Sequence, residues 1–365
     1  MTPHTHAAPN GGQRGENMAG ITYKCPSCGG YLNFDPDGGQ WKCPFCHSAF
    51  QEEQLLASEK KQADERAETA SDVDGAQVTY HCPSCGSQIV TDETTVATHC
   101  YYCHSPVVLQ GKLTDDMRPD GVVPFAIDQK KAVDAFMDWV RHKRFVPKGF
   151  FSNQQVQEMS GVYYPHFVTD CEAEGAIDGE GRHVSVAETP KYIITSTRHY
   201  HVRREGRFKF RGIMRPALSS TNRKLSDGIH PFPLEDAKPF AGAYLSGFVA
   251  ERRDLDAASI REDVEREVQS YVEPLLADDL HYDSYNVNAS ASVKDSATRY
   301  LLLPTWVLTY PNRKDPQNPY YYAMNGCTGR VCGKLPIDLK KLYLVGAGIA
   351  AAVFAAGCVL SYFLF

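Results

Sequence analysis

Eight cysteines in four CxxC pairs are the residues of this chain whose type and spacing best suit chemistry. They form two sets with identical internal spacing, displaced by 57 residues: Cys25, Cys28, Cys43 and Cys46, then Cys82, Cys85, Cys100 and Cys103. The surrounding residues repeat too, since TYKCPSCGG matches TYHCPSCGS and CPFCHS matches CYYCHS. Four thiolates at tetrahedral corners are a preferred ligand set of structural Zn²⁺. The pattern predicts two Cys₄ zinc sites, with one zinc ion in each copy of a repeat.

Other chemistry at these cysteines is less consistent with the pattern. The CxxCH motif of covalent haem attachment occurs at residues 43–47 and 100–104, but haem would leave the other four cysteines unexplained. A redox-active CxxC lacks a surrounding βαβ pattern. Iron remains open, because an S₄ tetrahedron suits iron as well as zinc. Four histidines adjoin the cysteines and are expected beside the sulfurs or at the surface: His47, His81, His99 and His104.

The rest of the composition supports metal sites over disulfides. The 365 residues carry a formal charge of −6, which argues against a chain that is basic throughout and binds nucleic acid over its whole surface. Residues 1–20 are polar and have no apolar signal region, so we expect a reducing compartment in which CxxC pairs bind metal. Four cysteines outside the repeat are expected to be packing or surface thiols: Cys171, Cys327, Cys332 and Cys358.

Small modules must position the cysteines. We expect a disordered extension over 1–20, zinc ribbons over 21–50 and 79–110, and a charged linker over 51–78. Each ribbon is too short to be stable by hydrophobic burial alone, so metal would hold it together. Gly29 and Gly86 stand where a tight CxxC turn favours positive φ.

A larger α+β domain of mostly antiparallel strands is expected over 120–336. A helix begins after Asp128 as N-cap, and short strands are expected over 162–248. A second helix is expected from Ser259 with a capping box to Glu262, followed by strands near 300–310. The pair Asn325-Gly326 predicts a tight type I′ hairpin turn.

The segment 342–365 contains 24 residues without a charge, long enough for one transmembrane helix. Lys334, Lys340 and Lys341 precede it, so the positive-inside rule places the bulk of the chain in the cytoplasm. We therefore expect a tail-anchored, single-pass protein of the cytoplasmic membrane.

A basic stretch over 198–211, RHYHVRREGRFKFR, is the second candidate for binding. We expect a hairpin with its turn near Glu205-Gly206, which would contact lipid headgroups or nucleic-acid phosphates, or simply be a solvated edge. The chain contains no GxxxxGK[ST], HExxH or GxSxG motif, so we infer neither an enzyme nor a small-molecule substrate.

Several motifs in order resemble one family, the bacterial transcription-factor-IIB-type zinc-ribbon-containing proteins, sometimes labelled primosomal helicases. They are TYKCPSCGG, WKCPFC, VVPF (122–125), PKGFF (147–151), GVYYPHFVTD (161–170), AYLSGF (243–248), LLLPTW (301–306) and MNGCTG (324–329). His166 and Cys327 depart from the family pattern. The resemblance implies zinc ribbons joined to a β-rich domain. We expect a membrane-tethered, non-enzymatic adaptor that binds a protein partner; the alternative is a nucleic-acid-binding protein that uses the ribbons and the 198–211 hairpin.

Overall fold

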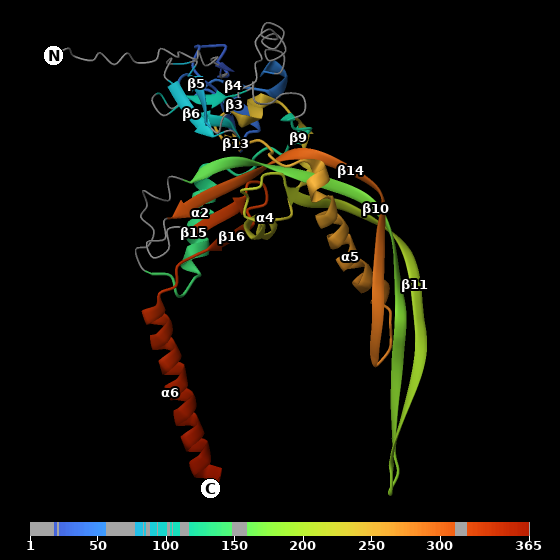
Figure 1. Ribbon diagram of the computed structural model, residues 1–365. Helices are drawn as coiled ribbons and strands as arrows, with labels where there is room; N and C mark the ends of the chain where they lie inside the picture. The colour runs from blue at the N-terminus through green and yellow to red at the C-terminus, as the bar shows by residue number, and fades with distance from the viewer. Residues whose placement is uncertain are drawn as a thin grey trace, which may run out of the picture.

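The computed structural model describes residues 18–19, 22–55, 77–82, 84, 88–92, 94–100, 103, 105–109, 117–147, 159–310 and 320–364. Two cysteine-bearing modules lie at one end, a large sheet follows, and a long β arm and a C-terminal helix extend from the other side (Figure 1). Residues 1–17, most of the expected linker, Cys85, Gly86 and His104 lie outside the described residues.

The first cysteine module is a small antiparallel sheet. Its strands are β2 (Asn33–Asp35), β3 (Gln40–Lys42) and β4 (Ala49–Phe50), paired in the order β2-β3-β4. The first CxxC turn precedes β2, and the second, Cys43 to Cys46, connects β3 to β4. Trp41, on the central strand, is only 1% exposed and closes the core of the module.

The second cysteine module is divided between two sheets. β5 (Gln77–His81) and β6 (Gln88–Asp92) form a hairpin, to which β1 (Met18–Ala19) adds a parallel strand. The hairpin of β7 (Thr95–His99) and β8 (Pro106–Val108) instead joins the large sheet, because β7 pairs with β13 (Val249–Glu251). The second module is thus built into the neighbouring domain.

Among the described residues, the large sheet has ten strands. The order along its main path is β12 (Lys238–Pro239), β9 (Gly121–Val122), β14 (Ser284–Tyr310), β10 (Ser160–Glu188), β13, β7 and β8. In addition, β11 (Ile193–Pro216) pairs with β10, β15 (Tyr320–Asn325) with β14, and β16 (Val331–Lys334) with β15. Most pairs are antiparallel, which confirms the expected class of this domain; β10–β13 and β14–β9 are parallel.

Three long strands replace the short strands expected from the sequence, and that expectation is wrong. β10 has 29 residues, β11 has 24 and β14 has 27, and β10 lies between the other two.

The expected hairpin over 198–211 is also wrong. β11 runs straight through Glu205 and Gly206, which pair with Ala176 and Gly175 of β10. Continuous pairing with β10 keeps this stretch extended, which the local Gly and charge pattern does not reveal.

The expected helix after Asp128 is confirmed. α2 spans Gln129–Arg141, and the Asp128 carboxylate accepts a hydrogen bond from the Lys131 N–H at 2.7 Å. The apolar side chains of Ala132 and Phe136 are buried, as the helical spacing predicts. A short helix, α4 (Arg223–Gly228), precedes three 3₁₀ turns, η3 (Leu234–Asp236), η4 (Gly242–Leu245) and η5 (Ala257–Ile260), which alternate with β12 and β13 along the chain.

α5 (Arg261–Ala277) is the second expected helix, but it begins differently. Residues 257–260 form the 3₁₀ turn η5, and the Ser259 hydroxyl donates to Asp256 O at 2.6 Å. The capping box to Glu262 is therefore wrong, because that hydroxyl already has a local partner. Apolar residues at helical spacing form the buried side of the helix: Val264, Val268 and Val272 are buried, whereas Tyr271 is 44% exposed.

The turn between β15 and β16 is longer than expected. Asn325 N–H donates to Arg330 O, so the loop is not a two-residue type I′ turn, and positive φ occurs at Gly329 instead. The Asn325 side chain explains the difference. Its oxygen accepts from the Cys327 and Thr328 N–H groups, and its nitrogen donates to Ile229 O. A tertiary contact, rather than the local dipeptide, selects this loop.

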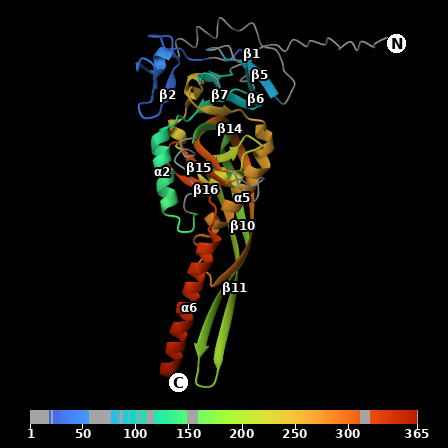
Figure 2. The same cartoon turned by 90° about the vertical axis from the view of Figure 1, so that its left-hand side faces the viewer.

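The arm consists of the distal parts of β10, β11 and β14, and both views show it projecting from the body on the same side as α6 (Figures 1 and 2). α5 packs against the arm near the body, where Ile177, Val202, Val272 and Leu276 form a small core. Beyond Arg182, which pairs with Ser284, the arm is a two-stranded ribbon. The large apolar side chains of its tip are exposed, including Val186, Tyr192 and Ile193.

α6 (Leu339–Leu364) confirms an apolar helix at the expected place. Its segment Leu339–Cys358 is long and apolar enough to cross a membrane and is 0% buried against the rest of the protein. Helices of this length and composition that pack on nothing suit a lipid environment.

Candidate metal centres

The sulfur atoms of Cys25, Cys28, Cys43 and Cys46 lie within 4.8 Å of one another. The Sγ atoms of Cys25 and Cys46 are 3.6 Å apart, and those of Cys28 and Cys43 are 3.5 Å apart. These distances exclude disulfide bonds, whose sulfurs lie about 2.0 Å apart. Four thiolates about 2.3 Å from a metal ion would have corner-to-corner distances of about 3.8 Å. The cluster therefore fits a four-sulfur metal site.

Neighbouring groups shape the first CxxC turn and shift the pKa values of two of its thiols in opposite directions. Gly29, with φ of 75°, ends the first CxxC turn and donates its N–H to Cys25 O, which confirms the expected positive φ. The Ser48 hydroxyl lies 3.3 Å from the Cys46 sulfur and lowers the pKa of that thiol to about 6. Although the Gly30 N–H acts in the opposite direction, the Cys46 and Cys43 thiols raise the pKa of Cys28 to about 12. Four sulfurs this close cannot all ionise without a cation between them.

The second cluster contains Cys82, Cys100 and Cys103 among the described residues, and the remaining expected ligand, Cys85, lies outside them. The Sγ atoms of Cys82 and Cys103 are 3.6 Å apart, as at the corresponding pair of the first cluster. The Ser105 hydroxyl lies 3.3 Å from the Cys103 sulfur, as Ser48 does from Cys46. The geometry brings together seven of the eight predicted ligands, in two groups that could each hold a metal ion.

The two serines were not among the predicted site residues. They stand two positions after the last cysteine of each set, in the matching segments CPFCHS and CYYCHS, so the repeat itself carried the signal. The neighbouring histidine is not a ligand in the first cluster. His47 is exposed, has φ of 58° and lies in the turn that allows Cys43 N–H to bond Ser48 O.

Burial divides each cluster into an inner and an outer half. Cys25 and Cys43 are 2% and 1% exposed, whereas Cys28 and Cys46 are exposed. In the second cluster Cys82 and Cys100 are buried, and Cys103 is half-buried. A bound metal would thus link a buried core to the surface turn of its module.

The first module docks on the large domain through the strand that closes its core. The Trp41 indole N–H donates to Ala243 O at 2.8 Å, and its ring contacts Tyr244, with centroids 5.2 Å apart. Phe34 N–H donates to Ser246 O at 3.0 Å. Lys131 of α2 forms an ion pair with Asp37 at 2.7 Å. The metal cluster of the first module is therefore mechanically connected to η4 and α2.

The four cysteines outside the repeat do not join a metal cluster in the part of the chain that the structure describes. Cys171 is buried in β10, Cys327 and Cys332 flank the β15–β16 loop, and Cys358 lies in α6. Burial raises the pKa of Cys327 to about 12, which keeps this thiol neutral. The positions of these four cysteines indicate packing or surface thiols.

The basic stretch of β11 faces acidic partners on β10. Lys209 pairs with Glu172 at 2.7 Å, Arg207 with Glu174 at 3.3 Å, and His201 lies 3.4 Å from Asp178. These side chains already pair with carboxylates on the neighbouring strand. Their positive charge is therefore less available to a nucleic-acid phosphate. Nucleic-acid binding stays a prediction, with its basic hairpin replaced by a continuous strand whose Arg207 and Lys209 are paired with carboxylates.

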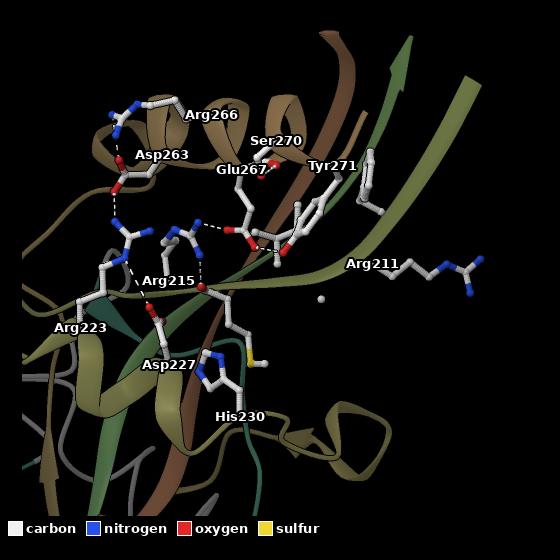
Figure 3. Close-up of a pocket in the computed structure, with 14 residues that line it drawn as sticks. Arg211, Arg215, Arg223, Asp227, His230, Asp263, Arg266, Glu267, Ser270 and Tyr271 are labelled. Atoms are coloured by element: carbon white, nitrogen blue, oxygen red, sulfur yellow. Dashed lines mark hydrogen bonds and ion pairs between the residues drawn. The ribbon is translucent and has the colours of Figure 1, made fainter. Parts of the chain in front are cut away.

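A polar cavity of about 670 Å³ lies between α5, α4 and β11 (Figure 3). Three of its four arginines point at carboxylates: Arg215 pairs with Glu267, and Arg223 and Arg266 lie 3.2 and 2.9 Å from Asp263, whereas Arg211 points away from the cavity (Figure 3). Because these charges are internally paired, the cavity is an ion-pair network that joins α4 and α5 to the base of the arm.

A buried histidine–serine pair lies on the other side of this region. His166 Nε2 is 2.9 Å from Ser226 Oγ, and burial lowers the pKa of His166 to about 4. A neutral imidazole beside a hydroxyl can activate a nucleophile. Here, however, the side chains are 2% and 5% exposed, and Nδ1 faces the Tyr164 carbonyl at 3.2 Å instead of a carboxylate. We assign the pair to the core.

The fold and the clusters define a mostly antiparallel β protein with two potential metal sites and one potential membrane helix. The chain is similar to YdjG of Bacillus subtilis (strain 168), a protein described as uncharacterized. The two are 29% identical over 338 residues, which cover 92% of this chain and 96% of YdjG. No family model and no solved structure matches the chain.

Proposed function

We propose that the two cysteine clusters are structural zinc sites, with about two zinc ions per chain, and that the protein is a membrane-tethered, non-enzymatic adaptor. The separations of 3.5–3.6 Å between sulfurs carry the zinc assignment, because they approach the edge of a Zn–thiolate tetrahedron. Cysteine ligands that complete the shell leave no open position for water or substrate. Membership of the transcription-factor-IIB-type zinc-ribbon-containing family is part of this proposal and rests on the ordered sequence motifs.

The tether in this proposal is α6. Its apolar segment follows Lys334 and includes Lys340 and Lys341 in its first turn, so the positive-inside rule retains the domain in the cytoplasm. The modules lie at the end of the molecule opposite α6, which presents them away from the membrane (Figure 1). This arrangement supports a protein partner in the cytoplasm that contacts the modules.

Metal analysis of the full chain purified from membranes tests the zinc assignment. We expect about two zinc ions per chain and a colourless protein; a red iron chromophore would overturn the zinc assignment.

Chelation should also release Trp41 from its contact with Ala243, which red-shifts the Trp41 fluorescence and increases its quenching by acrylamide. The Trp41→Phe variant should lack this change. Unchanged Trp41 fluorescence after complete metal loss would contradict a structural role for the first site.

The adaptor role needs a separate experiment. The full chain should recover the same protein partner from membranes in two detergents, and chelation should release it. Recovery of no specific partner in either detergent would contradict the adaptor role while leaving the zinc assignment intact.

A further inference from the structure

The end of α2 and the beginning of α6 form a cavity of about 500 Å³, which we call the juxtamembrane cavity. Both views show these two helix ends side by side (Figures 1 and 2). The lining includes Trp139, Lys143, Arg144 and Phe145 from the α2 side, and Ile337 and Leu342 from the α6 side. Nearly two hundred residues separate the two sides in sequence.

Backbone contacts hold the two sides of the cavity together. Asp338 N–H donates to Phe145 O at 2.7 Å, which joins the segment after α2 to the residue before α6. The Asp338 carboxylate in turn accepts from Lys341 N–H at 3.2 Å and caps α6. The cavity therefore stays at the base of the helix whatever direction α6 takes beyond it.

The charge around this cavity is positive and unbalanced. Within the described part of the chain, no carboxylate forms an ion pair with Lys143 or Arg144, which line the cavity, or with Lys334, Lys340 and Lys341, which lie close in sequence to lining residues on the α6 side. The nearby Asp338 caps backbone N–H groups, and Asp138 faces His142, with its carboxylate 3.9 Å from the ring. These cations contrast with Arg207 and Lys209 of β11, which pair with Glu174 and Glu172.

Apolar groups lie directly beside these cations. Lys143 Nζ is 5.0 Å from the centre of the Trp139 ring, a cation–π contact at the mouth of the cavity. Ile337 is 60% exposed and Leu339 is 50% exposed, and both lead into the apolar surface of α6. Amphipathic aromatic rings and cations at the start of a spanning helix suit the headgroup layer of a bilayer.

We propose that the juxtamembrane cavity binds the headgroup of an acidic phospholipid, with Lys143 and Arg144 at its phosphate and Ile337 and Leu342 along its first acyl carbons. Charge complementarity selects the anionic lipid, and the apolar side chains select a lipid over a soluble phosphate. The inference rests on the proposed insertion of α6 in a membrane.

Trp139 reports on this site, because the other two tryptophans, Trp41 and Trp306, are 1% and 4% exposed. The full chain is reconstituted with brominated phosphatidylglycerol or with brominated phosphatidylcholine at equal mole fraction, and tryptophan quenching is compared. We expect phosphatidylglycerol to quench about twofold more, since each cation near the surface favours anionic lipid. The Trp139→Phe variant should remove most of the difference.

Two double variants of equal charge test the named residues. Lys143→Gln/Arg144→Gln should bring quenching by the two lipids to the same level, whereas Lys130→Gln/Lys224→Gln, at exposed positions away from the cavity, should keep the difference. Equal quenching by both lipids in the unaltered protein would overturn the inference, and so would loss of the difference in both double variants.

Resistance of the protein to carbonate extraction from membranes is measured in parallel. Extraction of the unaltered protein would show that the tether fails, which is a different result from a tethered protein without lipid preference.

Discussion

At the scale of single residues, chemistry is decided by what surrounds each thiol or imidazole. Twelve cysteines occur in the chain, but among the described residues only those of the CxxC pairs belong to a group of three or more potential metal ligands within 4.8 Å of one another. Cys43 illustrates the difference, since it is 1% exposed and belongs to both a metal cluster and the hydrophobic core. A thiol such as Cys332 has only a carbonyl and packing contacts.

The Cys43→Ser substitution should reduce bound metal by about one ion per chain, because three thiolates hold zinc less tightly than four. The thermal midpoint should fall as well, since the first module loses its link between turn and core. Cys332→Ser is the matched control and should keep both values. Elemental analysis and thermal unfolding in detergent measure the two effects, and full metal content in Cys43→Ser would contradict the assignment.

His166 makes stability depend on pH. Its folded pKa of about 4 lies below the ordinary 6.5, because burial disfavours the imidazolium. The neutral ring therefore stabilises the fold fully above about pH 6.5, and this contribution is lost as the pH falls towards 4. The shift corresponds to about 3 kcal/mol at most. Thermal midpoints of the unaltered protein should fall more between pH 7 and 4.5 than those of His166→Gln; parallel curves would contradict this prediction.

At the scale of elements, the base of the arm depends on α5. The helix packs its valine stripe on β10 and β11, where the close approach needs Gly175: a Cβ there would lie 2.6 Å from Val272. The ion pair between Arg215 of β11 and Glu267 of α5 adds a polar contact. The side chain of Arg215 is 7% exposed, so its charge needs a partner.

Glu267→Ala should destabilise the protein by about 3 kcal/mol, because it leaves a buried guanidinium without its carboxylate. Glu265→Ala is the matched control on the same helix. Its carboxylate forms an exposed pair with Arg261 at 3.0 Å, which is worth about 0.5 kcal/mol or less. Denaturant unfolding of the two variants compares the costs, and equal effects would show that the buried pair contributes no more than the exposed one.

At the scale of the whole molecule, the arm and α6 cannot keep their present relation in a bilayer that α6 crosses. Both views show the arm extending alongside α6 to the level of its far end (Figures 1 and 2). The arm carries charged side chains such as Arg182 and Asp283, and it has open strand edges that hydrocarbon does not tolerate. Because the segment Leu339–Cys358 is 0% buried, the part of α6 beyond Leu342 can change direction relative to the arm while Asp338 stays bonded to Phe145.

We therefore expect the angle between α6 and the arm to widen on insertion. Spin labels at Ser196 in the arm and Gly357 in α6 should give longer distances in bilayers than in detergent. A second pair, Ser196 and Lys224, lies within the β domain and its short helix and should give equal distances in both. Equal distances for the first pair would mean that α6 does not cross the bilayer or that the arm is accommodated beside it.

The local parts of this structure followed from the sequence alone. The cysteine spacing predicted both clusters, because four ligands close together in the chain need only a turn and a hairpin to meet. Asp128 and the helical spacing after it predicted α2, and the uncharged C-terminal run predicted α6. These features depend on contacts between residues that are near one another in sequence.

Contacts between residues that are far apart in the sequence determined the remaining features of the structure. The length of β10 and β11, the acidic partners of the basic strand and the loop at Asn325 all depend on pairing or hydrogen bonding across the fold. So do the docking of Trp41 on η4 and the meeting of Arg144 with the base of α6. Eight cysteines were sufficient to indicate two candidate metal sites, but only the tertiary structure decided which surfaces accompany those sites, because strand register and helix packing are properties of the assembled core.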